Sequence, residues 1–292
     1  MNNPNFFIIG APKCGTTSLA AWLSEHPQIY IPYKEIHYFS TDLKSTWVPD
    51  RAQYEELFSR AEPQHKALGD ASVWYLYSKV AVQNIEKFCQ NPRYIVCLRN
   101  PVDMAYSLHE QQLVEGNENI ESFERAWELS EARLLGKEIS PWCLEPKHLV
   151  YKEACSLGRQ LERLFQMVPK ERVHLVILDD VKENPGAEYR KVLQFLNVDD
   201  DGRVDFSAHN PAKRNRFSFV RRMTLSLGNI KRRLGLHYPF GVLKWINQHN
   251  MQYRPRPELS PDMRRRLQDY FKADVEKLGA LIDRDFSGWI NK

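Results

Sequence analysis

Three short apolar runs, each bounded by polar turns, stand out along the chain: Phe6–Ile9, Tyr94–Leu98 and Val173–Leu178. In these runs the apolar residues follow one another instead of alternating with polar ones. Continuous apolarity indicates strands that are buried on both faces, as in a parallel sheet. The runs therefore predict three strands of a parallel sheet.

Around these runs the apolar residues recur at helical spacing. The helices that this pattern predicts span Ser18–Ser24, Val80–Phe88, Met104–Val114, Phe123–Leu135, Leu157–Val168, Tyr189–Leu196 and Asp262–Leu278. Alternation of strands and helices predicts an α/β fold in which helices flank a central parallel sheet. The chain contains no internal repeat, low-complexity segment or Gly/Ser-rich linker. We therefore expect residues 1–292 to form one domain, with a basic helical C-terminal segment from about residue 206.

That segment is strongly basic, although the net charge of the chain is only +4. From Phe206 to Pro257 it has no acidic residue and eleven basic ones: Lys213, Arg214, Arg216, Arg221, Arg222, Lys231, Arg232, Arg233, Lys244, Arg254 and Arg256. Such an excess suits an anionic ligand, an anionic acceptor or a peripheral contact with an anionic membrane. We expect no nucleic-acid partner.

An amphipathic helix is expected inside the basic segment. Its apolar stripe consists of Val220, Met223, Leu227, Ile230 and Leu234, spaced by three or four residues. The helix either packs this stripe on the sheet and turns its charges to solvent, or lies on an anionic membrane. Both alternatives are open at this point.

The composition favours a protein of a reducing compartment without a metal. The five cysteines form no CxxC pair, and the nine histidines show no HExxH spacing. We therefore expect neither a disulfide framework nor a zinc site. No apolar window is long enough to cross a bilayer, and the N-terminus lacks the basic n-region of a signal peptide. These features predict a cytoplasmic location, with any membrane contact peripheral.

The strongest chemical signal follows the first predicted strand. Phe6–Ile9 runs directly into the loop Gly10-Ala11-Pro12-Lys13-Cys14-Gly15-Thr16-Thr17-Ser18, and a helix comes next. A glycine-bearing loop between a strand and a helix N-terminus cradles phosphate, because free backbone N–H groups and the helix dipole attract the anion. Gly15 permits a close approach of the backbone, and the three hydroxyls that follow it add hydrogen-bond donors.

This loop departs from the Walker A pattern of nucleoside triphosphate enzymes. Gly10, Gly15 and Thr17 match G-x-x-x-x-G-K-[ST], but Thr16 stands where the pattern has its lysine. The lysine of this loop comes three residues earlier, at Lys13. A triphosphate enzyme needs that lysine on the β- and γ-phosphates and the next hydroxyl on Mg²⁺. We therefore expect the loop to bind a shorter 5′-phosphate chain without a metal.

The segment from Pro12 to Leu19 resembles the loop P-K-[CTS]-G-T-[TS]-x-L of sulfotransferases that use PAPS (3′-phosphoadenosine 5′-phosphosulfate). In that family a strand-end arginine and a serine eight residues later bind the 3′-phosphate of the donor, and Arg99 and Ser107 have this spacing. The resemblance implies a P-loop-type three-layer fold and PAPS as donor, with PAP as product. The donor-binding residues it implies are Lys13, Cys14, Gly15, Thr16, Thr17, Ser18, Arg99, Ser107 and, by composition alone, Lys213 and Arg214.

A second stretch carries the candidate acceptor chemistry. Lys34-Glu35-Ile36-His37-Tyr38-Phe39 resembles the K-E-P-H-F-F stretch of heparan-type and many bacterial sulfotransferases, in which the glutamate deprotonates the acceptor. The resemblance implies that Glu35 is the general base and that His37 orients the acceptor or the base. It also implies that Lys13 neutralises the leaving oxygen.

The segment Gly69–Leu76 corresponds to a heparan-type stretch close to G-E-K-T-P-A-Y-F. The lysine of that stretch helps to neutralise the transferring group, and Ala71 stands in its place here. This departure speaks against a glycosaminoglycan acceptor. Ser72, Trp74 and Tyr75 are candidates for lining the acceptor or donor pocket, with core packing as the alternative for Trp74.

The resemblance thus implies in-line transfer of a sulfuryl group from PAPS to a hydroxyl or amine, driven by positioning and electrostatics. Glycan, glycolipid, lipid and small alcohol are all open as acceptors. One alternative is a P-loop kinase or NTPase, which the Walker B-like strand end Val176–Asp180 favours. The other is a non-catalytic anion- or membrane-binding protein that uses the basic segment.

Overall fold

The computed structural model describes residues 3–44, 48, 50–207, 213–215, 251–253 and 258–291. Two compact units are formed. The first comprises Met1–Met104, Ser156–Asn210 and Gln268–Lys292, and the second Ala105–Cys155 and Pro211–Leu267. The amphipathic helix expected from Val220 to Leu234 lies outside the described residues. That all 292 residues form a single domain stays a prediction.

A five-stranded parallel sheet forms the centre of the first unit. In spatial order its strands are β2 (Ile29–Tyr30), β3 (Ala67–Ala71), β1 (Phe6–Gly10), β4 (Arg93–Leu98) and β5 (Val173–Ile177). The three strands predicted from the apolar runs are β1, β4 and β5. Every residue of β1 is buried, as expected for a strand covered on both faces.

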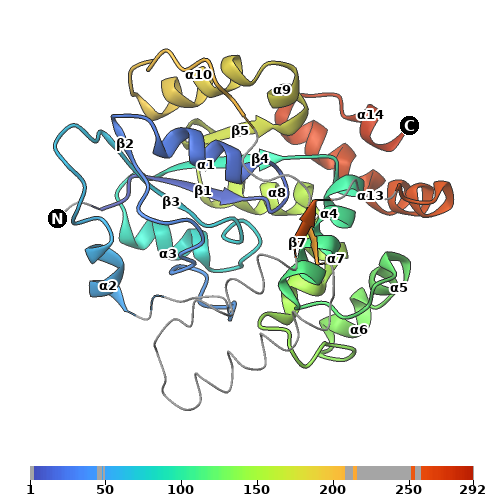
Figure 1. The fold of residues 1–292 in the computed structure, drawn as a ribbon. Helices are drawn as coiled ribbons and strands as arrows, with labels where there is room; N and C mark the ends of the chain where they lie inside the picture. The colour runs from blue at the N-terminus through green and yellow to red at the C-terminus, as the bar shows by residue number, and fades with distance from the viewer. Residues whose placement is uncertain are drawn as a thin grey trace. The chain divides into compact units, whose positions relative to one another are not determined.

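Helices cover both faces of this sheet, which confirms the predicted three-layer α/β fold (Figure 1). One face carries α1 (Thr16–Ser24), α9 (Leu178–Glu183) and α10 (Pro185–Leu196); the other carries α3 (Ala81–Phe88) and α8 (Leu157–Met167). The first unit also contains α2 (Arg51–Glu56), the 3₁₀ helix η2 (Lys170–Arg172), α14 (Ser287–Ile290) and most of α13 (Pro261–Ile282). The strand order changes direction between β1 and β4, and ligands of open α/β sheets bind at such a switch point.

The pattern of apolar residues does not predict β3, because Gly69 and Asp70 interrupt it. Both are explained by packing. A Cβ atom on Gly69 would lie 2.2 Å from the ring of Phe6, so the aromatic side chain on β1 requires a glycine opposite it. The Asp70 carboxylate is fully buried and accepts hydrogen bonds from Tyr54 (2.9 Å), Tyr75 (2.9 Å) and Ser72 (2.6 Å). A buried carboxylate is tolerated when its oxygens are satisfied in this way.

In its described residues, the second unit is built mainly from helices. They are α4 (Pro101–Glu115), which begins in the first unit, α5 (Phe123–Glu128), α6 (Ser130–Leu134), the 3₁₀ helix η1 (Pro146–Leu149), α7 (Tyr151–Ala154) and the start of α13. A two-stranded antiparallel sheet pairs β6 (Lys213–Asn215) with β7 (Met251–Tyr253). The single helix predicted at Phe123–Leu135 is divided into α5 and α6 at Leu129.

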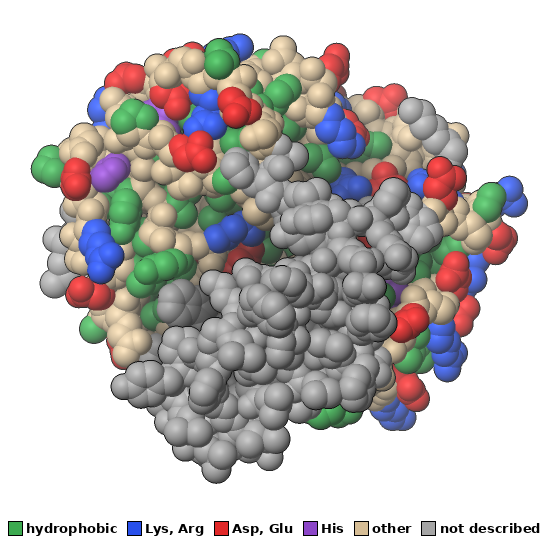
Figure 2. Space-filling view, viewed as in Figure 1, with side chains coloured by type: hydrophobic (Ala, Val, Ile, Leu, Met, Phe, Trp, Pro, Cys, Tyr) green, Lys and Arg blue, Asp and Glu red, His purple; other side chains and the backbone are tan. Residues whose placement is uncertain are grey.

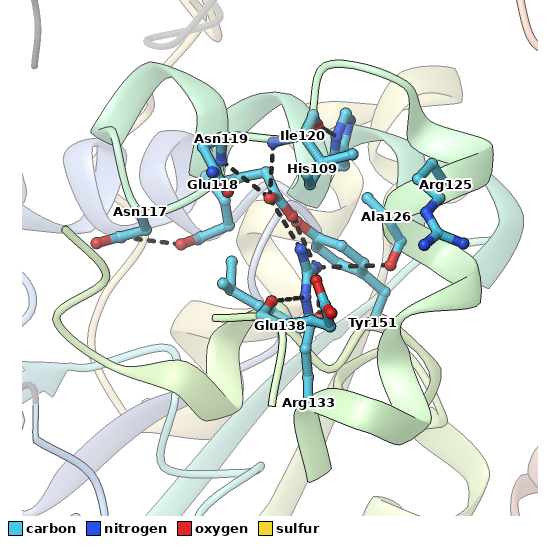
Figure 3. Close-up of polar contacts among 12 residues, drawn as sticks. His109, Asn117, Glu118, Asn119, Ile120, Arg125, Ala126, Arg133, Glu138 and Tyr151 are labelled. Carbon is cyan, nitrogen blue, oxygen red and sulfur yellow. Dashed lines mark hydrogen bonds and ion pairs between the residues drawn. The ribbon is translucent and has the colours of Figure 1, made fainter. Parts of the chain in front are cut away.

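A buried ion pair lies inside the second unit (Figure 3). The side chains of Arg133 and Glu118 are both fully buried, and the guanidinium binds the carboxylate through two hydrogen bonds of 2.7 and 2.9 Å. Glu118 also accepts from the hydroxyl of Tyr151 (2.9 Å) and from the backbone N–H groups of Asn119 and Ile120. A buried pair is stable only when such additional bonds satisfy both charges.

Tyr151→Phe is expected to lower the free energy of unfolding by about 1–3 kcal/mol, because it removes a hydrogen bond to a buried charge while it keeps the ring. Urea denaturation followed by circular dichroism measures this change. The control is Tyr270→Phe, in which the altered side chain is exposed and the change should stay within about 0.5 kcal/mol. An equal, small effect of both substitutions would show that Glu118 does not depend on the Tyr151 hydroxyl.

The described surface carries charges of both signs. Basic and acidic side chains are interspersed over the described part of the face drawn in Figure 2, so no field of a single sign develops there. None of the helices in the described ranges combines the length and the apolar character that a membrane span requires.

Candidate functional site

The candidate residues of the first unit gather at the carboxyl edge of the sheet. The neighbouring strands β3, β1 and β4 are parallel, so their carboxyl ends meet at the same edge. The phosphate loop follows β1 and Arg99 follows β4. The segment that carries Glu35 reaches the end of β3 through a parallel bridge between Lys34 and Ala71. The topology thus brings together three motifs that are far apart in the sequence.

The phosphate loop is held in an unusual backbone conformation. Lys13 and Gly15 both have positive φ, of 64° and 88°. The side chain of Arg99 donates a hydrogen bond of 3.0 Å from Nη1 to the carbonyl oxygen of Lys13, and Ala11 donates to the carbonyl of Cys97 at 2.9 Å. A non-glycine residue at positive φ is uncommon and persists only when its surroundings hold it there. Arg99 therefore stabilises the loop as well as adding positive charge beside it.

Gly15 also begins the helix α1. It is the N-cap residue, and no side chain caps the helix. A Cβ atom at this position would lie 2.9 Å from the side chain of Leu178, so both space and backbone favour glycine. The positive end of the helix dipole, Lys13 and Arg99 lie around the same loop. This arrangement suits an anion such as a phosphate.

The remaining loop residues differ in exposure. The Cys14 thiol is buried and lies 3.8 Å from the sulfur of Met104, and burial raises its pKa to about 12 despite the nearby charges of Arg99 and Lys13. Cys14 is therefore a neutral packing residue, and only its backbone is available to an anion. Thr16 is buried at the start of α1, whereas Thr17 and Ser18 are partly exposed.

Glu35 lies in a loop that is hydrogen-bonded to the end of β3. Its N–H donates to the carbonyl of Ala71 at 2.8 Å, and Glu35 and His37 have positive φ of 64° and 56°. One carboxylate oxygen pairs with Nζ of Lys34, and the other lies 2.8 Å from Nε2 of His37 and 3.3 Å from the backbone nitrogen of Val73. The side chain is 34% exposed, so an incoming molecule can reach it.

These partners determine the acidity of Glu35. Burial of the group would raise its pKa, but the hydrogen bond from His37 and the charge of Lys34 outweigh burial and lower the pKa to about 2. The carboxyl group is therefore ionised at neutral pH, as a general base must be. In this arrangement its basicity is also weak.

A buried network fixes the loop that carries Glu35 and His37. The N–H of His37 donates to Oγ of Ser72 at 3.0 Å, and this hydroxyl in turn donates to Asp70. Tyr75 lies in the core with its hydroxyl on Asp70, and the N–H of Phe39 reaches the same hydroxyl at 3.3 Å. Ser72 and Asp70 thus position the loop. Sequence reasoning did not assign them this task, because only the folded chain brings residues 35–39 beside residues 70–75.

The other predicted site residues are placed as follows. Trp74 is buried, and its ring packs edge-on against Tyr77. Ser107 is buried on α4 and belongs to the second unit, as do Lys213 and Arg214, whose backbone forms β6. The roles of these residues in donor or acceptor binding stay predictions.

The Walker B-like residues have structural partners. Asp179 accepts hydrogen bonds from Lys182 (2.7 Å) and from the indole N–H of Trp289 (3.0 Å). Asp180 forms a two-pronged ion pair with Arg284, with both distances 2.6 Å. Both carboxylates thus connect α9 to the C-terminal part of the first unit. These structural contacts, together with the missing Walker lysine, speak against a P-loop kinase.

The sequence and the fold of this chain were compared with those of known proteins. A family model described as the sulfotransferase domain matches residues 3–280. The chain belongs to the sulfotransferase family. The crystal structure of a sulfotransferase from Alicyclobacillus acidocaldarius superposes on this sulfotransferase with a TM-score of 0.73 and 27% sequence identity, and the match covers 99% of both chains. The resemblance identified from the phosphate loop is confirmed, and sulfotransfer is the activity that family and fold support.

Two curated relatives are also similar to this sulfotransferase, one at lower sequence identity and the other over part of the chain. Mouse heparan sulfate glucosamine 3-O-sulfotransferase 3B1 is 24% identical over 299 residues, which cover 98% of this sulfotransferase and 65% of the relative. The membrane-associated sulfotransferase kil1 of Dictyostelium discoideum is 33% identical over 105 residues, which cover 36% of this sulfotransferase and 22% of the relative. The sulfotransferase therefore spans about two thirds and about a fifth of the lengths of these relatives.

Proposed function

We propose that this sulfotransferase transfers the sulfuryl group of PAPS to a hydroxyl or amine by in-line displacement, without a metal. The observation that carries the proposal is the loop Gly10–Ser18 at the carboxyl end of the central strand β1, with Lys13 in the loop and Arg99 bonded to its backbone. A lysine so early in the loop suits a 5′-phosphosulfate better than a triphosphate with Mg²⁺.

The proposed step uses four groups of the chain. The acceptor oxygen or nitrogen attacks sulfur, its proton passes to Glu35, and a new bond to sulfur forms. The bond between sulfur and the bridging oxygen of the 5′-phosphate breaks, and PAP leaves. Lys13 and the N-terminus of α1 stabilise the negative charge that develops on the leaving oxygen. His37, 2.8 Å from Glu35, holds the carboxylate in place.

For the acceptor, we propose a glycan hydroxyl or amine as the first class to test. The support is the mouse relative, named for action on heparan sulfate glucosamine, which aligns with 98% of this chain. Ala71 in place of a lysine distinguishes this sulfotransferase from the heparan-type stretch, so glycolipids, other lipids and small alcohols belong in the same acceptor screen. A peripheral contact of the basic segment with an anionic membrane also stays a prediction.

Calorimetric titration tests the donor assignment. We expect PAP to bind in the presence of EDTA, and ATP with Mg²⁺ to bind far more weakly. Anionic vesicles form a third arm, because binding to vesicles but not to PAP would support a non-catalytic membrane-binding protein. Tight binding of ATP that requires Mg²⁺, together with weak binding of PAP, would contradict the proposal.

Ser107→Ala is expected to weaken PAP binding about 10- to 150-fold while binding of AMP, which lacks the 3′-phosphate, stays unchanged, because a hydrogen bond to a charged group is worth about 1.5–3 kcal/mol. Arg99→Ala should have a larger effect on PAP. It should also weaken AMP binding in part, since Arg99 bonds the carbonyl of Lys13 as well. Equal losses for PAP and AMP in Ser107→Ala would show that Ser107 is a structural residue of α4.

A further inference from the structure

The contacts of Glu35 pose a problem for its proposed task. Lys34 occupies one oxygen of the carboxylate and His37 the other, and the pKa of Glu35 is lowered to about 2. A general base works best when its pKa lies near the working pH, so a carboxylate held this acidic is a poor proton acceptor. Glu35 must lose its contact with one of these two side chains before it acts.

Lys34 is the partner that can leave. Its backbone is fixed by the bridge to Ala71, but its side chain is a flexible four-carbon stem that is 29% exposed. His37 is held more firmly, because its side chain is only 7% exposed and its N–H is bonded to Ser72. A partly exposed ion pair of this kind contributes only about 0–1 kcal/mol, so the ammonium can change partners when a second anionic group comes close.

The segment that carries Lys34 lies at the same edge of the sheet as the phosphate loop, because Lys34 bridges to Ala71 and Ala71 pairs with Ile8 of β1, shortly before the loop begins. In agreement with this placement, the charge of Lys34 lowers the pKa of the Cys97 thiol, against the larger opposing effect of burial. Cys97 is the penultimate residue of β4, and its carbonyl accepts from Ala11 at the start of the phosphate loop. Among the described residues, the charged and titratable groups near the pair include His37, which acts on Glu35, Cys97, which senses the charge of Lys34, and Asp70 of β3, which interacts with His37.

We propose that Lys34 moves from Glu35 to the oxygens of the transferring sulfuryl group when the donor binds, and that this movement releases Glu35 to accept the acceptor proton. The inference rests on the proposed PAPS-dependent function. It makes Lys34 a second catalytic cation on the acceptor side of the sulfuryl group, supplied from the segment that bridges to Ala71. It also couples the base to the donor, because Glu35 stays weakly basic until a sulfuryl group is in place.

The test measures the pKa of Glu35 directly, by ¹³C NMR of glutamate-labelled protein, with the Glu35 signal assigned by its absence from Glu35→Gln. Three states are compared: free protein, the PAP complex, and the complex with 3′-phosphoadenosine 5′-diphosphate. In the last of these the β-phosphate takes the place of the sulfuryl group. In the wild type we expect no titration above pH 4 in the free and PAP-bound states, and a pKa raised by one to two units or more with the diphosphate.

Lys34→Met separates the movement of Lys34 from simple repulsion by the diphosphate. In this variant the pKa of Glu35 should already be raised in the free protein, and the diphosphate should add a smaller shift than in the wild type. Lys34→Arg keeps the charge and should restore the wild-type pattern in part. The proposal is overturned if the diphosphate shifts the pKa equally in the wild type and in Lys34→Met, or does not shift it in the wild type although it binds. Failure of PAP and the diphosphate to bind would instead overturn the proposed function.

Discussion

Glu35→Gln should lower kcat about 10²–10⁴-fold and leave the affinity for PAP unchanged, which is the largest effect that we expect of a single substitution. Glutamine preserves the size of the side chain and can still bond to His37, but it cannot accept a proton. The measurement is kcat with PAPS across pH 4–9, with PAP affinity determined by calorimetry on the same preparations. The wild-type rate should fall as the pH drops through the pKa of Glu35 in the donor complex, and this acidic limb should be absent from the variant.

Glu171→Gln is the matched control, because Glu171 is an exposed glutamate in η2 and its substitution should leave both kcat and the pH profile unchanged. Unfolding gives a second measurement. The pKa of Glu35 in the folded protein is lowered from 4.5 to about 2, so its stabilising effect is present above pH 4.5 and is lost as the pH falls toward 2. Stability should therefore depend less on pH in this range in Glu35→Gln. A variant that retains the acidic limb of kcat would identify another base, with His37 as the next candidate.

Lys13→Ala should lower kcat by about 10²-fold or more, while PAP affinity falls much less. The reason is that the lysine acts on charge that develops only as the sulfuryl group leaves. The carbonyl that Arg99 bonds belongs to the backbone and is retained in the variant. Single-turnover rates with PAPS, set beside PAP affinities, measure the two effects separately.

The control for Lys13→Ala is Lys87→Ala, which removes an exposed lysine from the last turn of α3. Its kcat should equal that of the wild type. Lys13→Met keeps the length of the side chain and should lose as much rate as Lys13→Ala if charge is what matters. A near-normal kcat in Lys13→Ala would show that the leaving oxygen is stabilised by other groups.

The parts of the fold that follow from local signals could be predicted from the sequence. Continuous apolar runs predicted β1, β4 and β5, and the glycine-bearing loop after β1 predicted the phosphate site, because each signal lies within a few neighbouring residues. The strand β3 escaped prediction, since its Gly69 and Asp70 are explained only by Phe6 and by the three hydroxyls that surround the buried carboxylate. These contacts join residues that are far apart in the sequence, so no local pattern indicates them.

In the candidate site, too, the sequence predicts individual residues but not the tertiary contacts between them. The resemblance pointed to Lys13, Glu35 and Arg99, but the positive φ of Lys13 and Glu35 and the bond from Arg99 to the loop are tertiary effects. The task proposed for Lys34 depends on its pairing with Glu35 and on its bridge to Ala71, thirty-seven positions later in the chain. No local pattern distinguishes this lysine from an ordinary surface lysine.

Transfer of label from ³⁵S-PAPS tests the central claim most directly. The wild-type protein, Lys13→Ala and Glu35→Gln are each incubated with ³⁵S-PAPS and a cell extract in the presence of EDTA, and labelled products are separated and identified by mass spectrometry. We predict that the wild type transfers the label to an acceptor with release of one PAP per sulfuryl group, and that both variants transfer about 1% as much or less. PAPS turnover no faster than in protein-free extract, or equal labelling by the wild type and Lys13→Ala, would contradict the claim.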